Sequence, residues 1–261
     1  NKEDILRTSK EAAYKAGTVI KGSKALSVKA KSYSDYVTEV DIKCQNIIKN
    51  IIFQKFPDHV FLAEEDGKSF YPGQNMWIID PLDGTTNFIQ KLKHSSVSVA
   101  YYNGGKIMTG VIYDPYRDEM FSAIRGQGAF LNGKKISVSA KKEMSSCIFA
   151  TGMPFKSLEK AGSYFECLKE LLRNCAGIRR MGSAALDLAY TACGRFDGFF
   201  EGWLSSWDIA AGALIVEEAG GRIKDFAGDQ DYLANGSVIA GGTGIFDEFY
   251  EIINTNLKDE I

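Results

Sequence analysis

The chain of 261 residues predicts a mixed fold, in which an α+β half precedes an α/β half and helices and sheets stack in layers. Two helix-patterned segments lead into strands joined by short turns, whereas strands and helices alternate beyond residue 146. Between these regions lies a polar stretch, residues 139–146, with few apolar side chains. We therefore expect one domain at residues 1–142 and another at 143–261, with a functional site between them.

The N-terminal half opens with two helices. Residues 5–20 carry apolar side chains at helical spacing. A second helix is predicted for residues 41–55, and Pro57 stops it. An apolar strand, residues 60–63, then leads into an acidic run that begins at Glu64.

The most informative segment joins a buried strand to an acidic turn. The apolar run 76–79 predicts the strand, and we expect Pro81 to end its pairing because proline has no N–H group. Asp80 and Asp83 should therefore lie together at the strand end. Residues 84–86 follow with the pattern of a helix N-terminus, whose free N–H groups attract anions. Two carboxylates beside an anion site suit a divalent metal and a phosphate.

An antiparallel meander follows. Asn103-Gly104-Gly105 and Asn132-Gly133 are strong turn signals between apolar runs. The predicted strands cover residues 96–102, 106–113 and 119–124, and a further hairpin covers 129–138.

The C-terminal half alternates between strands and helices. Two of its acidic residues lie where such elements begin or end, Glu201 at the end of a strand and Asp208 just before a helix. Strands are predicted for residues 147–151, 176–180, 198–201 and 222–225, and helices for residues 158–174, 184–193, 209–219 and 246–257.

The composition excludes several classes of protein. Lysine and arginine number 31 against 33 aspartate and glutamate, and the resulting net charge of −2 argues against strong nonspecific binding of nucleic acids and against a polybasic membrane anchor. No apolar run reaches the ~18 residues of a membrane span, and we expect no signal peptide. The five cysteines form no Cys-x-x-Cys pair, so we expect free thiols and a cytoplasmic protein. We expect surface or capping roles for His59 and His94.

The motifs exclude two familiar phosphate chemistries. No Gly-x-x-x-x-Gly-Lys-Ser/Thr segment is present, so the chain is not a P-loop NTPase. Asp80 and Asp83 are three residues apart, whereas aspartyl-phosphate phosphatases place such a pair two apart. Acidic groups around Glu64, Asp80 with Asp83, and Asp208 each lie at a strand end or a helix start. If they converge, they offer the oxygen ligands that Mg²⁺ prefers.

These motifs resemble those of the inositol monophosphatase family of Mg²⁺-dependent, lithium-sensitive sugar phosphatases, in its bacterial form. Residues 77–88, WIIDPLDGTTNF, resemble the first signature of the family, and residues 207–221 resemble the second. Glu64-Glu65 and residues 35–41, DYVTEVD, match two upstream elements. The resemblance covers nearly the whole chain. It implies a layered αβαβα sandwich of the sugar-phosphatase type and a homodimer.

The resemblance also implies a set of metal ligands. Glu64, Asp80 and the Leu82 carbonyl would hold a first Mg²⁺, and Asp80, Asp83 and Asp208 a second. Glu64 would help to position a third, weaker ion. Mn²⁺ accepts the same oxygen ligands.

The catalytic and substrate residues follow from the same resemblance. Thr85, hydrogen-bonded to Asp41, would orient the attacking water together with Glu64. Backbone N–H groups of Gly84 and Thr85 would hold phosphate oxygens, and Glu201 would accept hydroxyl groups of the sugar. The residues expected to contact substrate are Asp83, Gly84, Thr85, Gly182, Ser183, Ala184, Glu201 and Asp208.

The implied reaction is hydrolysis of inositol monophosphate to inositol and phosphate by a metal-activated water, without a phosphoenzyme. The loop 151–156 lacks a serine of the animal relatives, which leaves other small sugar or polyol phosphates open as substrates. Fructose 1,6-bisphosphate and histidinol phosphate are the enzymatic alternatives, since the fold of the family supports all three activities. Lys156, Arg179 or Arg180 could meet the second phosphate of a bisphosphate. A non-enzymatic alternative is a protein recruited to an RNA or transcription complex.

Overall fold

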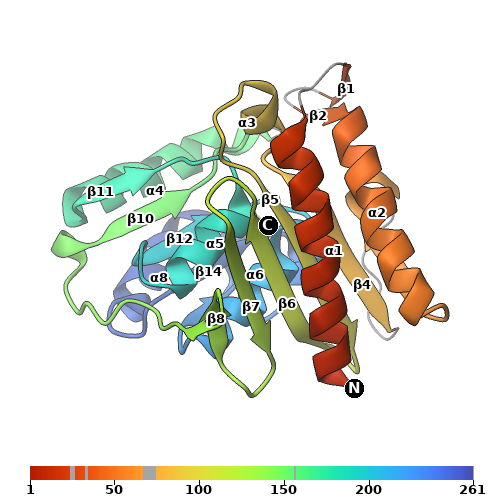
Figure 1. Cartoon of the computed structure of the whole chain (residues 1–261). Coiled ribbons are helices and arrows are strands. Elements are labelled where there is room, and N and C mark those ends of the chain that lie inside the picture. Colours follow the sequence, from red (N-terminus) through yellow and green to blue (C-terminus); the bar gives the residue numbers. More distant parts are fainter. Residues whose placement is uncertain (24–26, 33–34, 67–74, 156, 261) are drawn as a thin grey trace.

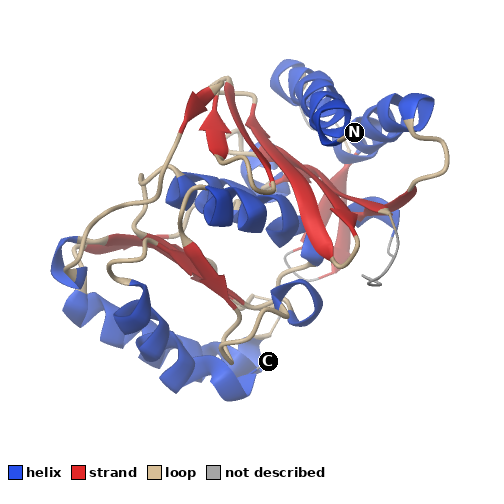
Figure 2. Ribbon diagram, turned by 90° about the horizontal axis from the view of Figure 1, so that it is seen from below, coloured by secondary structure: helices blue, strands red, loops and turns tan. Residues whose placement is uncertain are grey.

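The computed structural model describes residues 1–23, 27–32, 35–66, 75–155 and 157–260, and in it five layers stack on one another (Figure 1, Figure 2). A helix pair, a seven-stranded sheet, a second helix pair, a five-stranded sheet and a third helix pair follow in that order. The predicted αβαβα sandwich is confirmed. No helix within the described residues is long and apolar enough to span a membrane.

The first helix pair is formed by α1 (Lys2–Gly22) and α2 (Glu39–Lys55), which cover the outer face of the larger sheet. Small residues of α1 face that sheet, and a side chain at Gly17 would come within 2.5 Å of the Tyr113 ring. Along the chain, the two helices are separated by an antiparallel hairpin of β1 (Val28–Ser32) and β2 (Asp35–Thr38), which the sequence pattern did not predict.

The seven-stranded sheet contains the predicted meander. β3 (Val60–Ala63) pairs in parallel with β4 (Met76–Asp83), and all later pairs are antiparallel. The remaining strands are β5 (Ser96–Asn103), β6 (Lys106–Asp114), β7 (Glu119–Ile124), β8 (Ala129–Leu131) and β9 (Lys134–Lys135).

The prediction that Pro81 ends this strand is wrong, because β4 continues to Asp83 through a bulge. Asp80 pairs with Ser98 and Asp83 pairs with Ser96, so Pro81 and Leu82 together oppose the single residue between the two serines. The bulge accommodates a proline, which has no N–H group to offer the ladder. Residues three apart in a regular strand face opposite sides, but one extra residue restores the phase. The bulge therefore turns Asp80 and Asp83 toward the same side of the sheet.

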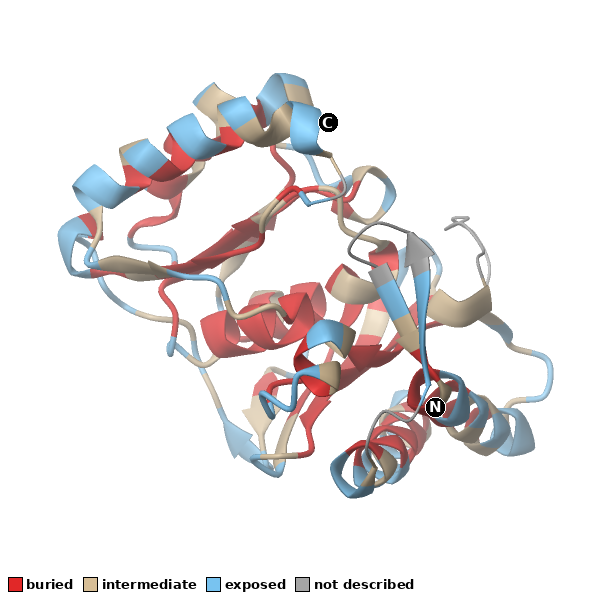
Figure 3. Cartoon of the chain, turned by 90° about the horizontal axis from the view of Figure 1, so that it is seen from above, coloured by how far each residue is buried: buried red, intermediate tan, exposed pale blue. Residues whose placement is uncertain are grey.

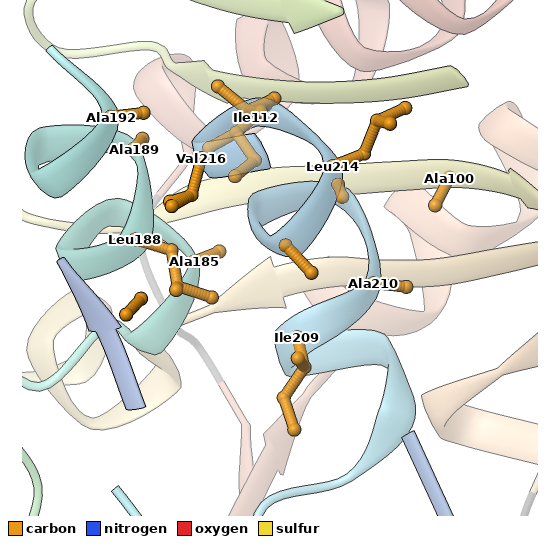
Figure 4. Close-up of a cluster of buried hydrophobic side chains, with 14 of the residues drawn as sticks. Ala100, Ile112, Ala185, Leu188, Ala189, Ala192, Ile209, Ala210, Leu214 and Val216 are labelled. Carbon is orange, nitrogen blue, oxygen red and sulfur yellow. The ribbon is translucent and has the colours of Figure 1, made fainter. Parts of the chain in front are cut away.

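The central helix pair, α5 (Ala184–Ala192) and α6 (Ser206–Glu218), is buried between the two sheets (Figure 3). Figure 4 shows Leu188 of α5 and Leu214 of α6 in the apolar cluster that also contains Ile112 of the larger sheet. Close approach needs glycine here, because a side chain at Gly110 would meet the Ala211 backbone oxygen at 2.7 Å. These helices follow residue 142 and yet pack against both sheets, and the division into domains at that residue remains a prediction.

The five-stranded sheet has the order β11-β10-β12-β14-β13 and is mixed. β10 (Ile148–Thr151) pairs in parallel with β11 (Gly177–Arg179) and β12 (Gly198–Glu201), whereas β14 (Val238–Gly241) pairs antiparallel with β12 and with β13 (Arg222–Lys224). Helices α4 (Ala161–Asn174) and α8 (Phe246–Leu257) cover its outer face, where the rings of Phe149 and Phe249 stack at 4.3 Å. The short elements are α3 (Thr85–Ile89), α7 (Tyr232–Asn235) and the 3-10 turns Glu64–Asp66, Met144–Ser146, Leu158–Lys160 and Lys258–Glu260.

Candidate active site

A cavity of about 450 Å³ lies at the end of β4, where β3, β4 and α3 meet α6 of the central layer. The sequence-predicted residues that line it come from four separate parts of the chain, and they are Glu64, Asp80, Leu82, Asp83, Gly84, Thr85, Gly182 and Asp208. Tyr36, Phe155 and Arg180 also line it, and of these three only Arg180 is named from the sequence as a candidate for contact with substrate.

Three aspartates converge at this cavity. One carboxylate oxygen each from Asp80, Asp83 and Asp208 lies within 4.8 Å of the other two. The bulge in β4 supplies the first two on one face of the sheet. Asp208 arrives from the first turn of α6, where its Oδ2 accepts the Ser205 backbone N–H at 2.7 Å. The helix begins three residues before the predicted start, and Ser-x-x-Asp, a variant of the capping box, was the signal for it.

The carboxylates of this cluster repel one another when they are ionised. Burial raises the pKa of Asp80 well above its usual range, and neighbouring carboxylates raise it further, Glu64 foremost. Burial likewise raises the pKa of Asp208, and Asp83 adds to the effect. A divalent cation would relieve this crowding, and a set of hard carboxylate oxygens is the donor set that Mg²⁺ and Mn²⁺ accept. The residues present therefore fit such a metal.

Asp83 is held by its surroundings. Its Oδ2 accepts the Ser183 hydroxyl at 2.5 Å, the Ala185 N–H at 3.0 Å and the Ser96 hydroxyl at 3.4 Å. Burial raises the pKa of Asp83 to about 6, and these hydrogen bonds act in the opposite direction. Ser183 and Ala184 were expected beside the substrate, but the Ser183 side chain is buried against Asp83 and only Gly182 of that trio lines the cavity.

Glu64 is positioned by the 3-10 turn at the end of β3. Neighbouring Asp66 forms an ion pair with Lys49 at 2.6 Å and accepts a hydrogen bond from Gln45 at 3.1 Å. Gln45 also accepts the Glu65 backbone N–H at 3.1 Å. These contacts with α2 hold the 3-10 turn in place, and of its three acidic residues, 64–66, Glu64 is the one that lines the cavity.

Thr85 and Asp41 form the predicted pair. The Thr85 hydroxyl lies 3.0 Å from Asp41 Oδ1 and 3.0 Å from the Leu82 carbonyl oxygen. Asp41 is itself fixed at the start of α2, because its Oδ2 accepts the Thr38 backbone N–H at 2.8 Å and the Thr38 hydroxyl. Burial raises the pKa of Asp41, against the effect of these hydrogen bonds. The Thr85 hydroxyl has one proton for two acceptors, so its lone pairs stay available to a ligand.

A smaller cavity of about 200 Å³ continues the first one, since Phe155, Arg180 and Asp208 line both. Glu201, at the end of β12, lines the smaller cavity. Burial raises the pKa of Glu201 to about 8, while Arg180 lowers it. A side chain at Gly152 would lie 1.6 Å from Glu201 Oε1, so this glycine leaves room for the carboxyl group.

The other candidates for a second phosphate differ in position. Arg179 is exposed and donates to the adjacent Ile178 carbonyl at 3.1 Å, and Lys156 lies outside the described residues. Sequence reasoning missed Asp187 of α5, which is 1% exposed and whose Oδ1 has no hydrogen-bond partner among the described residues. Burial raises the pKa of Asp187 well above its usual range, and Glu201 adds to the effect.

Both histidine side chains contact aromatic side chains, and no hydrogen bond between a histidine and a cysteine occurs among the described residues. His94 is 5% exposed and packs on the Tyr190 ring, so the expected surface or capping role was wrong for this side chain. His59 lies between Phe56 and Tyr101, and its Nδ1 accepts the Trp77 indole N–H at 3.0 Å. All five cysteines are free thiols.

Comparison with known proteins agrees with this geometry. The model of the inositol monophosphatase family matches residues 1–257. The Escherichia coli protein Nus factor SuhB is 42% identical over 98% of this chain and 97% of its own length. The crystal structure of extragenic suppressor protein suhB from Bartonella henselae superimposes with a TM-score of 0.92 at 40% identity, covering 97% of this chain and 100% of that one. An IMPase from Thermotoga maritima gives a TM-score of 0.89 at 34% identity, covering 98% and 99%. The chain belongs to the inositol monophosphatase family.

Proposed function

We propose that the protein is a Mg²⁺-dependent phosphomonoesterase that hydrolyses inositol monophosphate or a closely similar polyol phosphate. The observation that carries the proposal is the convergence of the Asp80, Asp83 and Asp208 carboxylates within 4.8 Å, in a cavity that Glu64 and Thr85 also line. A cavity lined by so many carboxylates repels a phosphate monoester unless cations intervene.

The metal would be held by carboxylate and carbonyl oxygens. Glu64, Asp80 and the Leu82 carbonyl form one proposed set, and Asp80, Asp83 and Asp208 form the other, with two to three ions in all. Bound Mg²⁺ would supply charge neutralisation and Lewis-acid activation of water. Mn²⁺ suits the same oxygens.

The chain itself would orient the nucleophilic water and hold the phosphate. With its proton directed to Asp41, the Thr85 hydroxyl can accept a hydrogen bond from water, and Glu64 can accept the water proton. Gly84, whose φ is +86°, leads into α3 at Thr85 and exposes the adjacent N–H groups to phosphate oxygens. Any L side chain at Gly84 would be strained and would meet the His94 carbonyl oxygen at 3.0 Å.

The adjoining cavity with Glu201 and Arg180 supports a polyol over a bisphosphate. Glu201 can exchange hydrogen bonds with ring hydroxyls, whereas its carboxylate competes with a second phosphate for Arg180. Fructose 1,6-bisphosphate and histidinol phosphate are the alternatives. If either were hydrolysed with a kcat/KM tenfold above that of inositol 1-phosphate, the proposed substrate would be wrong.

Phosphate release over this substrate panel, with and without Mg²⁺ and Li⁺, tests the proposal. We expect release to need Mg²⁺, to fall with Li⁺ and to drop by more than about 100-fold in Asp83→Asn. Unchanged hydrolysis in that variant at saturating Mg²⁺ would refute the assignment. A cytoplasmic homodimer is part of the proposal, and sedimentation of the purified protein tests its oligomeric state.

A second role is favoured by one observation, that the 42% identical Escherichia coli relative is called a Nus factor. The chain could likewise take part in a transcription complex, through protein contacts rather than RNA, because its net charge is −2. A gel shift with RNA, alone and with transcription factors, beside the phosphate-release assay separates the roles. Assembly into a complex by Asp83→Asn without turnover would support the second role.

A further inference from the structure

A second cavity, of about 500 Å³, lies at the opposite end of the central layers from the carboxylates. β5 and α6 each connect the two regions. Ser96, the first residue of β5, contacts Asp83, whereas Tyr102 near the other end lines the second cavity. Glu217, which also lines it, is nine residues beyond Asp208 on α6, or about 14 Å along the helix axis. The second cavity is therefore separate from the proposed active site.

An ion pair holds the two walls of this cavity together. Arg125 follows β7 of the larger sheet, and its Nη2 lies 2.9 Å from Glu217 Oε2 on α6. Its Nε donates to the Ile107 carbonyl at 2.7 Å. Both charged side chains are partly buried, with 30% and 25% exposed. The ion pair neutralises both charges, and these contacts hold this part of the cavity lining in place, as in preformed ligand sites.

Tyr232 adds a hydroxyl-bearing side chain to the cavity lining. The residue is 6% exposed and lines the cavity. Burial raises the pKa of Tyr232 above its usual value, so the hydroxyl stays neutral and can both donate and accept.

Two opposite charges lie at the rim. Lys106 opens β6 and Asp231 precedes α7, and neither forms an ion pair with any described residue. The cavity lining also includes the apolar side chains of Ile107 and Leu233. A cation, a carboxylate, a hydroxyl and an apolar wall therefore face one space.

We propose that this cavity binds a small zwitterion, namely an α-amino acid with an apolar side chain. Its carboxylate would meet Lys106 and accept the Tyr232 hydroxyl proton, while its ammonium group would meet Asp231. Its side chain would pack on Ile107 and Leu233. The proposed active site, lined by carboxylates, suits a different ligand, so the two sites are chemically distinct.

Isothermal titration calorimetry of the full chain in EDTA tests this directly, with leucine and phenylalanine as probes. We expect saturable binding with a Kd of about 1 mM or tighter. N-acetyl-leucinamide, which lacks both charges, should not bind. Because the metal is removed, the result does not depend on phosphatase activity.

Variants locate the binding. Lys106→Met and Asp231→Asn are exposed changes that leave the fold intact, and each should weaken binding about tenfold. Tyr232→Phe should weaken it about twofold to tenfold. The matched surface changes Lys134→Met and Asp58→Asn, at exposed residues that do not line the cavity, should have no effect.

Three outcomes would overturn the proposal. One is the absence of saturable binding of either amino acid up to about 10 mM. Another is equal binding by N-acetyl-leucinamide or by both rim variants. The third is displacement of the amino acid by inorganic phosphate with Mg²⁺, because that would assign the binding to the other cavity.

Discussion

Removal of the Ser183 hydroxyl provides a direct test of how Asp83 is held. Asp83 Oδ2 accepts two serine hydroxyls, Ser183 at 2.5 Å and Ser96 at 3.4 Å, and both serines are buried. A hydroxyl bound to an ionised carboxylate contributes about 1.5–3 kcal/mol. The Ser96 bond is longer than the usual range for two oxygens and should contribute below about 1 kcal/mol. Ser183→Ala and Ser96→Ala therefore make the same chemical change at one acceptor with different expected results.

We expect Ser183→Ala to weaken metal binding about 10–100-fold and Ser96→Ala by less than about threefold. Loss of the Ser183 bond also raises the pKa of Asp83 above its value of about 6, because that bond favours the ionised form. The metal needs the ionised carboxylate, so the defect should be larger at pH 6 than at pH 8. Ser183 additionally caps α5, accepting the Leu186 N–H at 3.4 Å, which adds about 1 kcal/mol of lost stability.

Calorimetric titration with Mn²⁺ measures the affinity, and urea unfolding in EDTA measures the stability of the metal-free protein. Equal loss of affinity in the two serine variants would refute the reasoning. So would a Ser183→Ala protein that is less stable but binds the metal normally.

Three further predictions concern other sites. Gly152→Ala should raise KM more than it lowers kcat, because its Cβ would lie 1.6 Å from Glu201 Oε1 and displace the carboxyl group; an unchanged KM in steady-state assays would contradict this. His59 should make folding weaker in acid. Burial lowers the pKa of His59 below 6.5, so its contribution to folding stability is present above that pH and is lost as pH falls through the folded pKa. At that point Nδ1 gains a proton and can no longer accept the Trp77 indole N–H, a hydrogen bond of about 1 kcal/mol. Urea unfolding from pH 8 to 5 should therefore show a smaller loss of stability in His59→Gln than in the unmodified protein. Asp187 has a raised pKa, so any stability that it contributes is present below about pH 4 and falls as pH rises toward the folded pKa. Measured by urea unfolding, the stability of Asp187→Asn relative to the unmodified protein should therefore rise with pH above about 4, by at most about 1.4 kcal/mol per pH unit, and a constant difference would exclude this.

The order of helices and strands along the chain was predictable because hydrophobic periodicity and turn residues are local signals, whereas the order of the layers followed from the family resemblance. β3 begins and ends at the predicted residues, and the meander and the outer helix α8 follow their patterns closely. The hairpin β1–β2 escaped prediction because its Val28, Lys29 and Ala30 are exposed and so show no alternation between buried and exposed positions.

The candidate site was predictable as a set of residue types but not as a geometry. Convergence of Asp80 with Asp208 depends on long-range packing between β4 and α6, which no local pattern reports. Helix starts were misplaced for a local reason. Thr38 caps α2 through Asp41, and Ser205 pairs with Asp208 in the same way at α6, so each helix begins two residues before its aspartate, whereas the predicted helices began at residues 41 and 209. The Ser183 contact with Asp83 joins residues 100 apart in the sequence and left no signal.

The extra residue in β4 ties metal binding to correct folding. A chain in which β4 had slipped by one residue against β5 would direct Asp80 and Asp83 to the opposite face of the sheet, away from Asp208 on α6. Such a molecule could not offer all three carboxylates to the same cation. Because a ligand stabilises only the state that binds it, the cation would favour the native pairing over the slipped one by mass action. The cation proposed for hydrolysis would then also select the correct strand register, and its apparent affinity would report the fraction of molecules that paired correctly.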